Sequence, residues 1–148
     1  MIKVEHTVVI DRPIEEVFDF MAKVENLPRW AENTIEAQQT SEGPLGAGTT
    51  CTVLNKAVRR QMLHHFVVTE YERPTRYAAK TTAGPFPMHL SYTLERVERG
   101  TSLRTVSEAE LGGILKLGEP LMRRMARKQI EVDHARLKDI LESQAASG

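Results

Sequence analysis

The histidine side chains are the first candidates for chemistry in this chain, and their spacing argues against a metal site. His64 and His65 are adjacent, so on a strand they point to opposite faces and cannot both bind one metal ion. The other three histidines, His6, His89 and His134, have no ligand spacing with them. We therefore predict neither a metal ion nor a cofactor.

Asp133 is the one acidic residue that the pattern places on a buried face. Residues 120–142 begin with a proline, which suits the first position of a helix, and contain no further Gly or Pro. Their apolar residues recur every three or four positions and predict one buried face: Met122, Met125, Ala126, Ile130, Leu137, Ile140 and Leu141. On a helical wheel Asp133 falls among these residues, so it is our candidate catalytic group.

A carboxylate on a buried face needs a hydrogen-bonding partner, or desolvation raises its pKa. The candidate partners on the strands are His64 or His65, Tyr77, Tyr92 and Ser107. Asp133 then orients a ligand or exchanges protons with it. In the alternative interpretation Asp133 pairs with a nearby arginine and merely holds the helix in place.

Other catalytic signatures are missing from the sequence. No Gly-x-Ser-x-Gly motif is present, which argues against an α/β-hydrolase nucleophile. The glycine-rich residues 43–48 lack the Gly-Lys-Ser/Thr ending of a phosphate-binding loop, so we interpret them as a connection between strands. Cys51 lies on the same side of its strand as Val53, which indicates inert packing, although a thiol that lines a pocket could be modified.

Composition narrows the class of protein. The 148 residues include 20 basic and 20 acidic side chains, so no overall field favours nucleic acid or an anionic membrane. The single cysteine excludes an internal disulfide and favours a reducing, cytoplasmic location. No apolar run reaches the roughly 20 residues that span a bilayer, and the N-terminus does not resemble a secretion signal. We expect one domain over residues 1–142 and a flexible tail over residues 143–148.

Four basic residues lie close together in the predicted terminal helix: Arg123, Arg124, Arg127 and Lys128. Such a run is typical of a solvated outer face. Contact with an acidic partner or with anionic lipid is the alternative.

Periodicity predicts an α+β architecture with an antiparallel sheet. Residues 2–10 alternate as a strand, and residues 14–21 and 24–31 follow as two short helices. Six more strands are expected before the terminal helix: 34–40, 49–55, 59–71, 76–82, 88–97 and 101–111. Their short connections indicate antiparallel neighbours.

The inward side of this sheet carries unusually small side chains at its centre. Alternation places Ala79, Thr81, Thr105, Ser107 and Ala109 on the side that faces the terminal helix. A tightly packed sheet would have larger aliphatic residues there, so a cavity with a few hydroxyl groups is expected. In the alternative, methionines of the terminal helix and the aromatic residues fill this space. Trp30 would close one end, as a gate or as an anchor for the second short helix.

The chain resembles the SRPBCC, or START-like, superfamily, in particular its bacterial polyketide cyclase/dehydrase-like branch. The resemblance spans nearly the whole chain and depends on the order of several short segments: Val17-Phe18, Leu27-Pro28-Arg29-Trp30, Gly46-Ala47-Gly48-Thr49, Gly84-Pro85, Gly100-Thr101 and Leu137-Lys138. It implies a helix-grip fold, in which a curved seven-stranded antiparallel sheet holds a long C-terminal helix with an apolar cavity between them.

The resemblance leaves several functions open. The first is binding or carriage of a small hydrophobic ligand such as a lipid, an isoprenoid or a polyketide-like molecule. The second is a cyclase or dehydratase that uses polar groups of the pocket as acid and base, and the third is a module that modulates a partner protein. The oligomeric state, monomer or homodimer, is also left open. The residues expected to line the pocket are Trp30, Cys51, Tyr77, Ala79, Thr81, Leu90, Tyr92, Thr105, Ser107, Ala109, Met122, Met125, Ala126, Gln129, Ile130 and Asp133.

Overall fold

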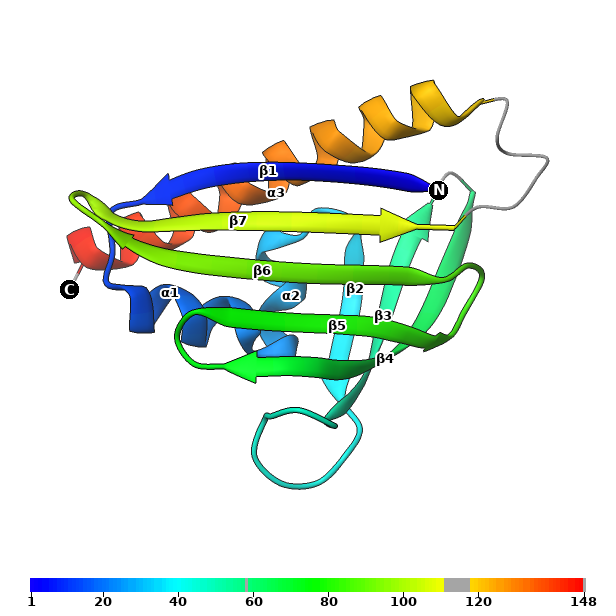
Figure 1. Cartoon of the computed structure of the whole chain (residues 1–148), viewed down its shortest axis with the longest axis horizontal. Coiled ribbons are helices and arrows are strands. Elements are labelled where there is room, and N and C mark those ends of the chain that lie inside the picture. Colours follow the sequence, from blue (N-terminus) through cyan, green and yellow to red (C-terminus); the bar gives the residue numbers. More distant parts are fainter. Residues whose placement is uncertain (58, 111–117, 148) are drawn as a thin grey trace.

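A computed structural model describes residues 1–57, 59–110 and 118–147 and shows one curled antiparallel sheet of seven strands. The strands lie in the order β1-β7-β6-β5-β4-β3-β2 (Figure 1). Their bounds are β1 Ile2–Ile10, β2 Thr34–Gln39, β3 Thr50–Ala57, β4 Arg60–Glu72, β5 Arg76–Ala83, β6 Met88–Val97 and β7 Gly100–Ala109. Each matches the expected strand to within about two residues, except that Leu111 lies outside the described residues. The predicted α+β helix-grip architecture is confirmed.

Two short helical segments follow β1. Helix α1, Ile14–Ala22, buries one apolar stripe. Glu15 and Glu16 lie in its first turn, where their negative charges interact favourably with the positive end of the helix dipole. The second predicted helix consists of a 3-10 turn, η1 (Val24–Asn26), and a four-residue helix, α2 (Leu27–Trp30). Pro28 lies in the first turn of α2 and cannot donate a backbone hydrogen bond to η1, so one continuous helix does not form.

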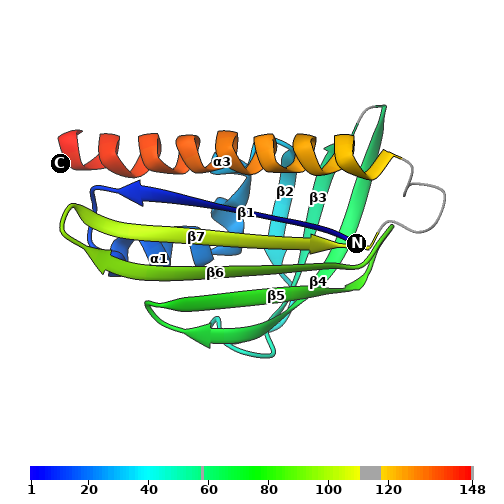
Figure 2. The same ribbon diagram turned by 45° about the horizontal axis from the view of Figure 1, so that its top comes forward.

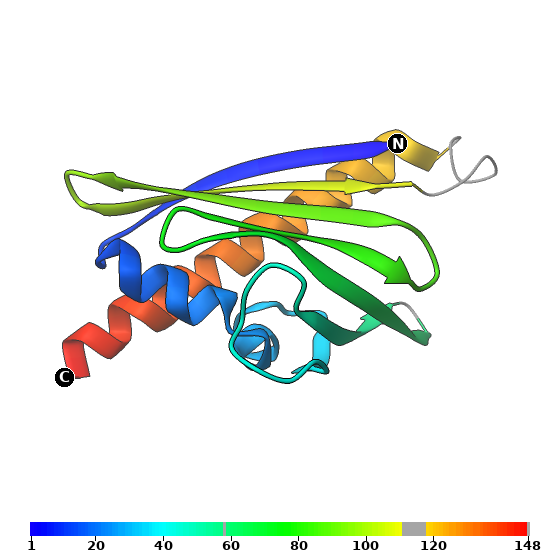
Figure 3. The same cartoon turned by 60° about the horizontal axis from the view of Figure 1, so that its bottom comes forward.

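The long helix α3, Glu119–Ser147, runs along the curled sheet, and α1 and α2 lie on the same side (Figures 2 and 3). Residues 143–147 continue this helix, whereas a flexible tail was predicted there. The reason is local, because these residues include alanines and no Gly or Pro interrupts them before Gly148.

The two halves of α3 differ in burial. Leu137 and Leu141 in the C-terminal half are fully buried in the core. Met125 in the N-terminal half is 59% exposed, and Leu121 is 61% exposed. The prediction that Met125 belongs to the buried face is therefore wrong.

Polar contacts explain why the C-terminal half of α3 is the anchored half. The ammonium of Lys138 donates to the carbonyl of Val9 at 2.8 Å, and Glu142 accepts from the backbone N–H of Asp11 at 2.9 Å. The contacts lie at the end of β1 and in the turn that follows it. The helix is thus fixed in its C-terminal half, where Leu137 and Leu141 enter the core, and its first turns lie towards the other end of the sheet (Figure 2).

Gly100 opens β7 in a backbone conformation that only glycine adopts readily. Its φ is 129°, and a Cβ atom there would clash with the carbonyl oxygen of Ile10 and the backbone of Arg12. The hairpin between β6 and β7 therefore packs directly against the end of β1.

Candidate functional site

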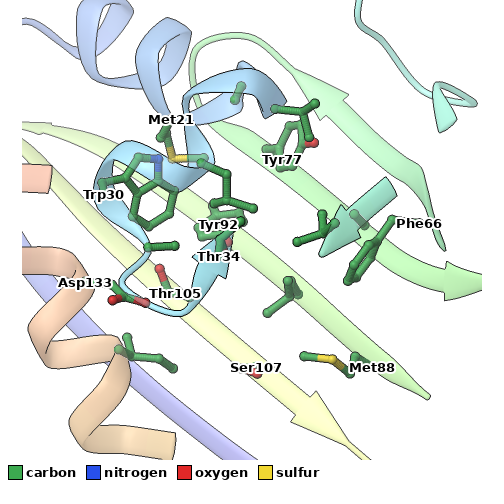
Figure 4. A pocket seen from close by; sticks show the side chains of 18 of the residues that line it. Met21, Trp30, Thr34, Phe66, Tyr77, Met88, Tyr92, Thr105, Ser107 and Asp133 are labelled. Atoms are coloured by element: carbon green, nitrogen blue, oxygen red, sulfur yellow. The ribbon is translucent and has the colours of Figure 1, made fainter. Parts of the chain in front are cut away.

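A cavity of about 190 Å³ lies between the inner face of the sheet, α3 and the α1–α2 region (Figure 4). Side chains from every layer line it: Met21, Ala22, Val24, Leu27, Trp30, Ala31, Thr34, Cys51, Val53, Asn55, Phe66, Tyr77, Ala79, Met88, Leu90, Tyr92, Thr105, Ser107, Ile130, Asp133 and His134. Most are apolar or aromatic. The site is therefore a largely hydrophobic pocket with a small number of polar groups.

The structure brings many of the residues predicted for the pocket to this cavity: Trp30, Cys51, Tyr77, Ala79, Leu90, Tyr92, Thr105, Ser107, Ile130 and Asp133. The others do not line it: Thr81, Ala109, Met122, Met125, Ala126 and Gln129. The small residues on the inner face of β5 and β7 thus leave space near the middle of these strands, and the space does not extend to Thr81 and Ala109.

The misplaced residues have physical reasons for their positions. Met122, Met125 and Ala126 belong to the N-terminal half of α3, which is more exposed than the half that packs on the core. The hydroxyl of Thr81 accepts from the backbone N–H of Met88 at 2.9 Å, so it bridges two strands. The amide of Gln129 accepts from Asn33 at 3.0 Å and donates to Asp133 at 2.9 Å, which holds it away from the cavity.

Aromatic rings form one wall of the cavity. The ring centroids of Tyr77 and Tyr92 lie 5.9 Å apart, and Tyr77 also makes an edge contact with Phe18 at 6.5 Å. Burial raises the pKa of both tyrosines, so their hydroxyl groups stay protonated at neutral pH. The wall therefore offers flat apolar faces and neutral hydroxyl groups.

Trp30 of α2 lies at one end of the cavity and is only 4% exposed (Figure 4). Its indole Nε1 is buried and has no hydrogen-bond partner among the residues that the structure describes. Such a burial suits the anchor that the sequence suggested. The unpaired N–H also leaves a donor beside the cavity that a ligand could satisfy.

Cys51 is a buried free thiol at the cavity. Desolvation, with a smaller contribution from the negative charge of Glu25, raises its pKa to about 11. The thiolate is the nucleophilic form, so the raised pKa and the burial of the side chain favour the packing role that the sequence indicates.

Asp133 reaches the cavity from α3, but its partners are not those expected from the sequence. One of its oxygens, Oδ1, accepts from the backbone N–H of Glu32 at 3.0 Å and from Gln129 at 2.9 Å. These contacts tie α3 to the connection between α2 and β2. Desolvation raises the pKa of the carboxyl group, and the two hydrogen bonds oppose that rise. The arginine pairing that we considered is replaced by a backbone N–H and an amide.

His134, the next residue of α3, is the polar side chain that the pocket prediction missed. It is 1% exposed and lines the cavity. Its Nε2 lies 2.7 Å from the hydroxyl of Thr105 on β7, and its Nδ1 lies 2.7 Å from Nδ1 of His6 on β1. Burial lowers the pKa of His134 to about 4, with a smaller effect from His6, so the ring is neutral at physiological pH.

A signal for His134 was present in the helix pattern. It lies three residues before Leu137 and seven before Leu141, so it shares their face of the helix. Those two leucines are fully buried, whereas the prediction gave equal weight to the methionines of the N-terminal half. The pairing with His6 carries no sequence signal, because the two residues are 128 positions apart.

His64 and His65 lie on opposite faces of β4, as predicted. His64 is buried against Phe66 and Phe86, with ring centroids 6.0 and 5.2 Å away, and His65 is exposed. Within the described ranges no group of three or more His, Cys, Asp or Glu side chains is placed to hold a metal ion. None of the helices that the structure describes is long and apolar enough to cross a bilayer.

Comparison with known proteins identifies the family. Residues 1–142 match the family described as polyketide cyclase / dehydrase and lipid transport, and the chain belongs to this family. A comparison with curated proteins found no match. The family description covers several functions and does not identify a ligand for this chain.

Solved structures show the same fold. A START superfamily protein from Mycobacterium smegmatis superposes with a TM-score of 0.83 at 14% identity, covering 96% of this chain and 98% of that one. The di-domain ARO/CYC BexL from the BE-7585A biosynthetic pathway gives 0.76 at 20% identity, with 96% of this chain matching 47% of BexL. The protein TTHA0849 from Thermus thermophilus gives 0.72 at 19% identity over 99% of both chains.

Proposed function

We propose that this protein binds a compact hydrophobic molecule of one or two rings that carries at least one hydrogen-bonding group. The observation that supports this most directly is the cavity of about 190 Å³ with a mostly apolar and aromatic lining. In other proteins an engineered apolar cavity of roughly 150 Å³ holds benzene. A cavity of similar size suits a small ring system better than an extended acyl chain.

The polar groups at the cavity suggest how such a ligand would be oriented. Thr105 of β7 and Asp133 of α3 line one side of the cavity (Figure 4), and His134 of α3 contacts the Thr105 hydroxyl. The unpaired indole N–H of Trp30 belongs to α2. A hydroxyl or carbonyl group on the ligand could exchange hydrogen bonds with these groups, while its apolar body contacts the tyrosines. Polyketide-like and other small ring molecules carry such groups, and the family description includes polyketide cyclases.

The other candidate functions are less well supported. A filled cavity beside a large exposed apolar patch would favour the protein-interaction module, and the cavity of about 190 Å³ argues against it. An enzymatic role would need acid–base groups at the cavity, and His134 and Asp133 provide a basis for that alternative.

We propose that the protein is located in a reducing cytosol, consistent with its one free buried thiol.

Trp30 provides a direct test of ligand binding, because it is the one tryptophan of the chain and it lines the cavity. We expect the bicyclic ketone 2-tetralone to quench Trp30 fluorescence with a saturable binding curve. Native mass spectrometry of protein purified from its own host would then search for a retained small molecule. Quenching that rises linearly with 2-tetralone, as for free indole in solution, together with no retained molecule, would argue against the proposal.

A further inference from the structure

We propose that Thr105, His134 and His6 form a relay that exchanges protons between a bound ligand and the outer edge of the sheet, so that the cavity catalyses enolisation of a bound ketone. The inference rests on the proposed ligand binding and adds a reaction to it. It starts from two contacts of 2.7 Å, one between Thr105 and His134 and one between His134 and His6, which connect the three side chains in series.

The line of contacts connects the cavity with the edge of the molecule. Thr105 and His134 both line the cavity and are buried. His6 is half-buried on β1, which is an edge strand of the sheet. His134 therefore separates the ligand space from a ring that reaches solvent.

The short contact between two Nδ1 atoms requires complementary protonation. A neutral imidazole has one N–H donor and one acceptor nitrogen, so one Nδ1 must carry the proton and the other must accept it. If the Thr105 hydroxyl donates to Nε2 of His134, then Nδ1 of His134 donates to His6. If His6 donates instead, the direction of every bond reverses and the Thr105 hydroxyl is free to donate into the cavity. Passing from one arrangement to the other moves protons along the line.

The arrangement follows the general logic of an activated hydroxyl. A hydroxyl group lies within hydrogen-bond reach of an imidazole nitrogen, and a third group orients that imidazole through its other nitrogen. Because His134 remains neutral when buried, it can pass a proton on rather than retain it. His6 acts through His134 and is a positioning residue.

The enolisation step balances with these groups alone. A C–H bond beside the ligand carbonyl breaks, its electron pair forms a C=C bond, and the carbonyl π electrons move to oxygen. The released proton goes to the Thr105 oxygen, the Thr105 hydroxyl proton passes to Nε2 of His134, and the Nδ1 proton of His134 passes to Nδ1 of His6. This step leaves an enolate in the cavity and an imidazolium at His6. The enolate takes a deuteron from D₂O at carbon when it leaves the cavity, and His6 releases its Nε2 proton to water, so that ligand and side chains are neutral again.

The test measures hydrogen–deuterium exchange at the carbons beside the carbonyl of 2-tetralone in D₂O by proton NMR. Wild-type protein should accelerate exchange over buffer and over an equal concentration of imidazole. General acid–base catalysis is typically worth about a hundredfold or more. Thr105→Val and His134→Gln should lose most of the acceleration when the exchange rate is measured at saturating 2-tetralone, where a change in affinity does not affect the rate. Thr105→Ser keeps the hydroxyl group and should retain the acceleration. His65 is exposed and lies outside the cavity, so His65→Gln should have no effect on the exchange rate.

Two outcomes would overturn the relay. One is tight binding of 2-tetralone without faster exchange in wild-type protein, and the other is unchanged acceleration in Thr105→Val. Absence of Trp30 quenching would instead count against the proposed ligand.

In that case ring ¹⁵N NMR of the ligand-free protein decides the relay. One protonated and one unprotonated Nδ1, with the His134 signals shifted in His6→Gln, would support the relay. Two rings with the same Nδ1 protonation state would overturn it.

Discussion

His134 contributes both to the packed core and to the polar groups of the cavity. It belongs to the buried face of α3, and its two ring nitrogens contact residues of two different strands, Thr105 and His6. Its neighbour Asp133 is bonded instead to the connection between α2 and β2. These two adjacent residues of α3 thus form hydrogen bonds in different directions. His134 contacts the sheet, and Asp133 contacts the connection between α2 and β2.

Because His134 is buried in its neutral form, we predict that the protein loses stability in mild acid. The unfolded chain binds a proton at this histidine below a pH of about 6.5, whereas the folded protein does so only near pH 4. The free energy of unfolding should therefore fall as the pH drops from about 6.5 to 4 and then level off for this group. A difference of this size corresponds to roughly 3 kcal/mol at 1.36 kcal/mol per pH unit.

Urea unfolding at several pH values measures this effect. His134→Gln should flatten the dependence between pH 6.5 and 4, while His65→Gln should change it only through the smaller charge effect of His65 on the pKa of His64. His64, whose pKa is also lowered by burial, contributes in the same direction, so some slope should remain in His134→Gln. Equal slopes in wild type and His134→Gln would show that His134 is already protonated in the fold.

At the scale of the elements, α3 divides into an anchored half and an exposed half. The C-terminal half holds the core through Leu137 and Leu141 and holds the turn after β1 through Lys138 and Glu142. The N-terminal half exposes Leu121 and Met125. The cavity lies against the middle of the helix, at Ile130 to His134, where these two halves meet.

This division predicts that two leucines of the same helix contribute very differently to stability. Leu141→Ala should lower the free energy of unfolding by about 2 to 5 kcal/mol, because it leaves a cavity in the core. Leu121→Ala should change it by no more than about 0.5 kcal/mol, since the side chain is exposed. Chemical denaturation of both variants measures the difference. Similar losses in the two variants would mean that the helix packs along its whole length.

At the scale of the whole molecule, the interior combines a dense core with an unfilled space. Phe18, Leu94 and Leu103 pack with essentially no exposed surface around α1, whereas the small side chains of Ala79 and Ser107 leave the cavity next to α3. Most protein interiors have few voids of this size. The space is therefore a property of the choice of residues on β5 and β7.

Filling the cavity should separate stability from binding. Ala79→Leu should leave the free energy of unfolding unchanged or raise it by up to about 2 kcal/mol, because the added atoms enter existing space. The same variant should lose saturable Trp30 quenching by 2-tetralone. Ala109→Leu is the matched control, since Ala109 does not line the cavity and its quenching should stay as in wild type. A loss of about 1 to 3 kcal/mol in Ala79→Leu, typical of overpacking, would indicate that the space is already filled.

The sequence by itself determined the elements and their order, because the alternation of strands and the three-and-four spacing of helices are local properties of the chain. It also placed small residues on the inner face of the sheet, which was enough to expect a cavity with Tyr77, Ala79, Thr105 and Ser107 at its wall. Its family segments implied the helix-grip fold that the structure has.

Only the tertiary structure decided how far α3 is rotated and which of its turns meet the core. Packing of Leu137 and Leu141 turned His134 inwards and left Met125 in solvent, although both lie on apolar stretches of the same helix. The contact between His6 and His134 joins residues near opposite ends of the chain, so no local pattern could predict it. It arises because antiparallel pairing places β1 beside β7, and α3 then lies across both strands.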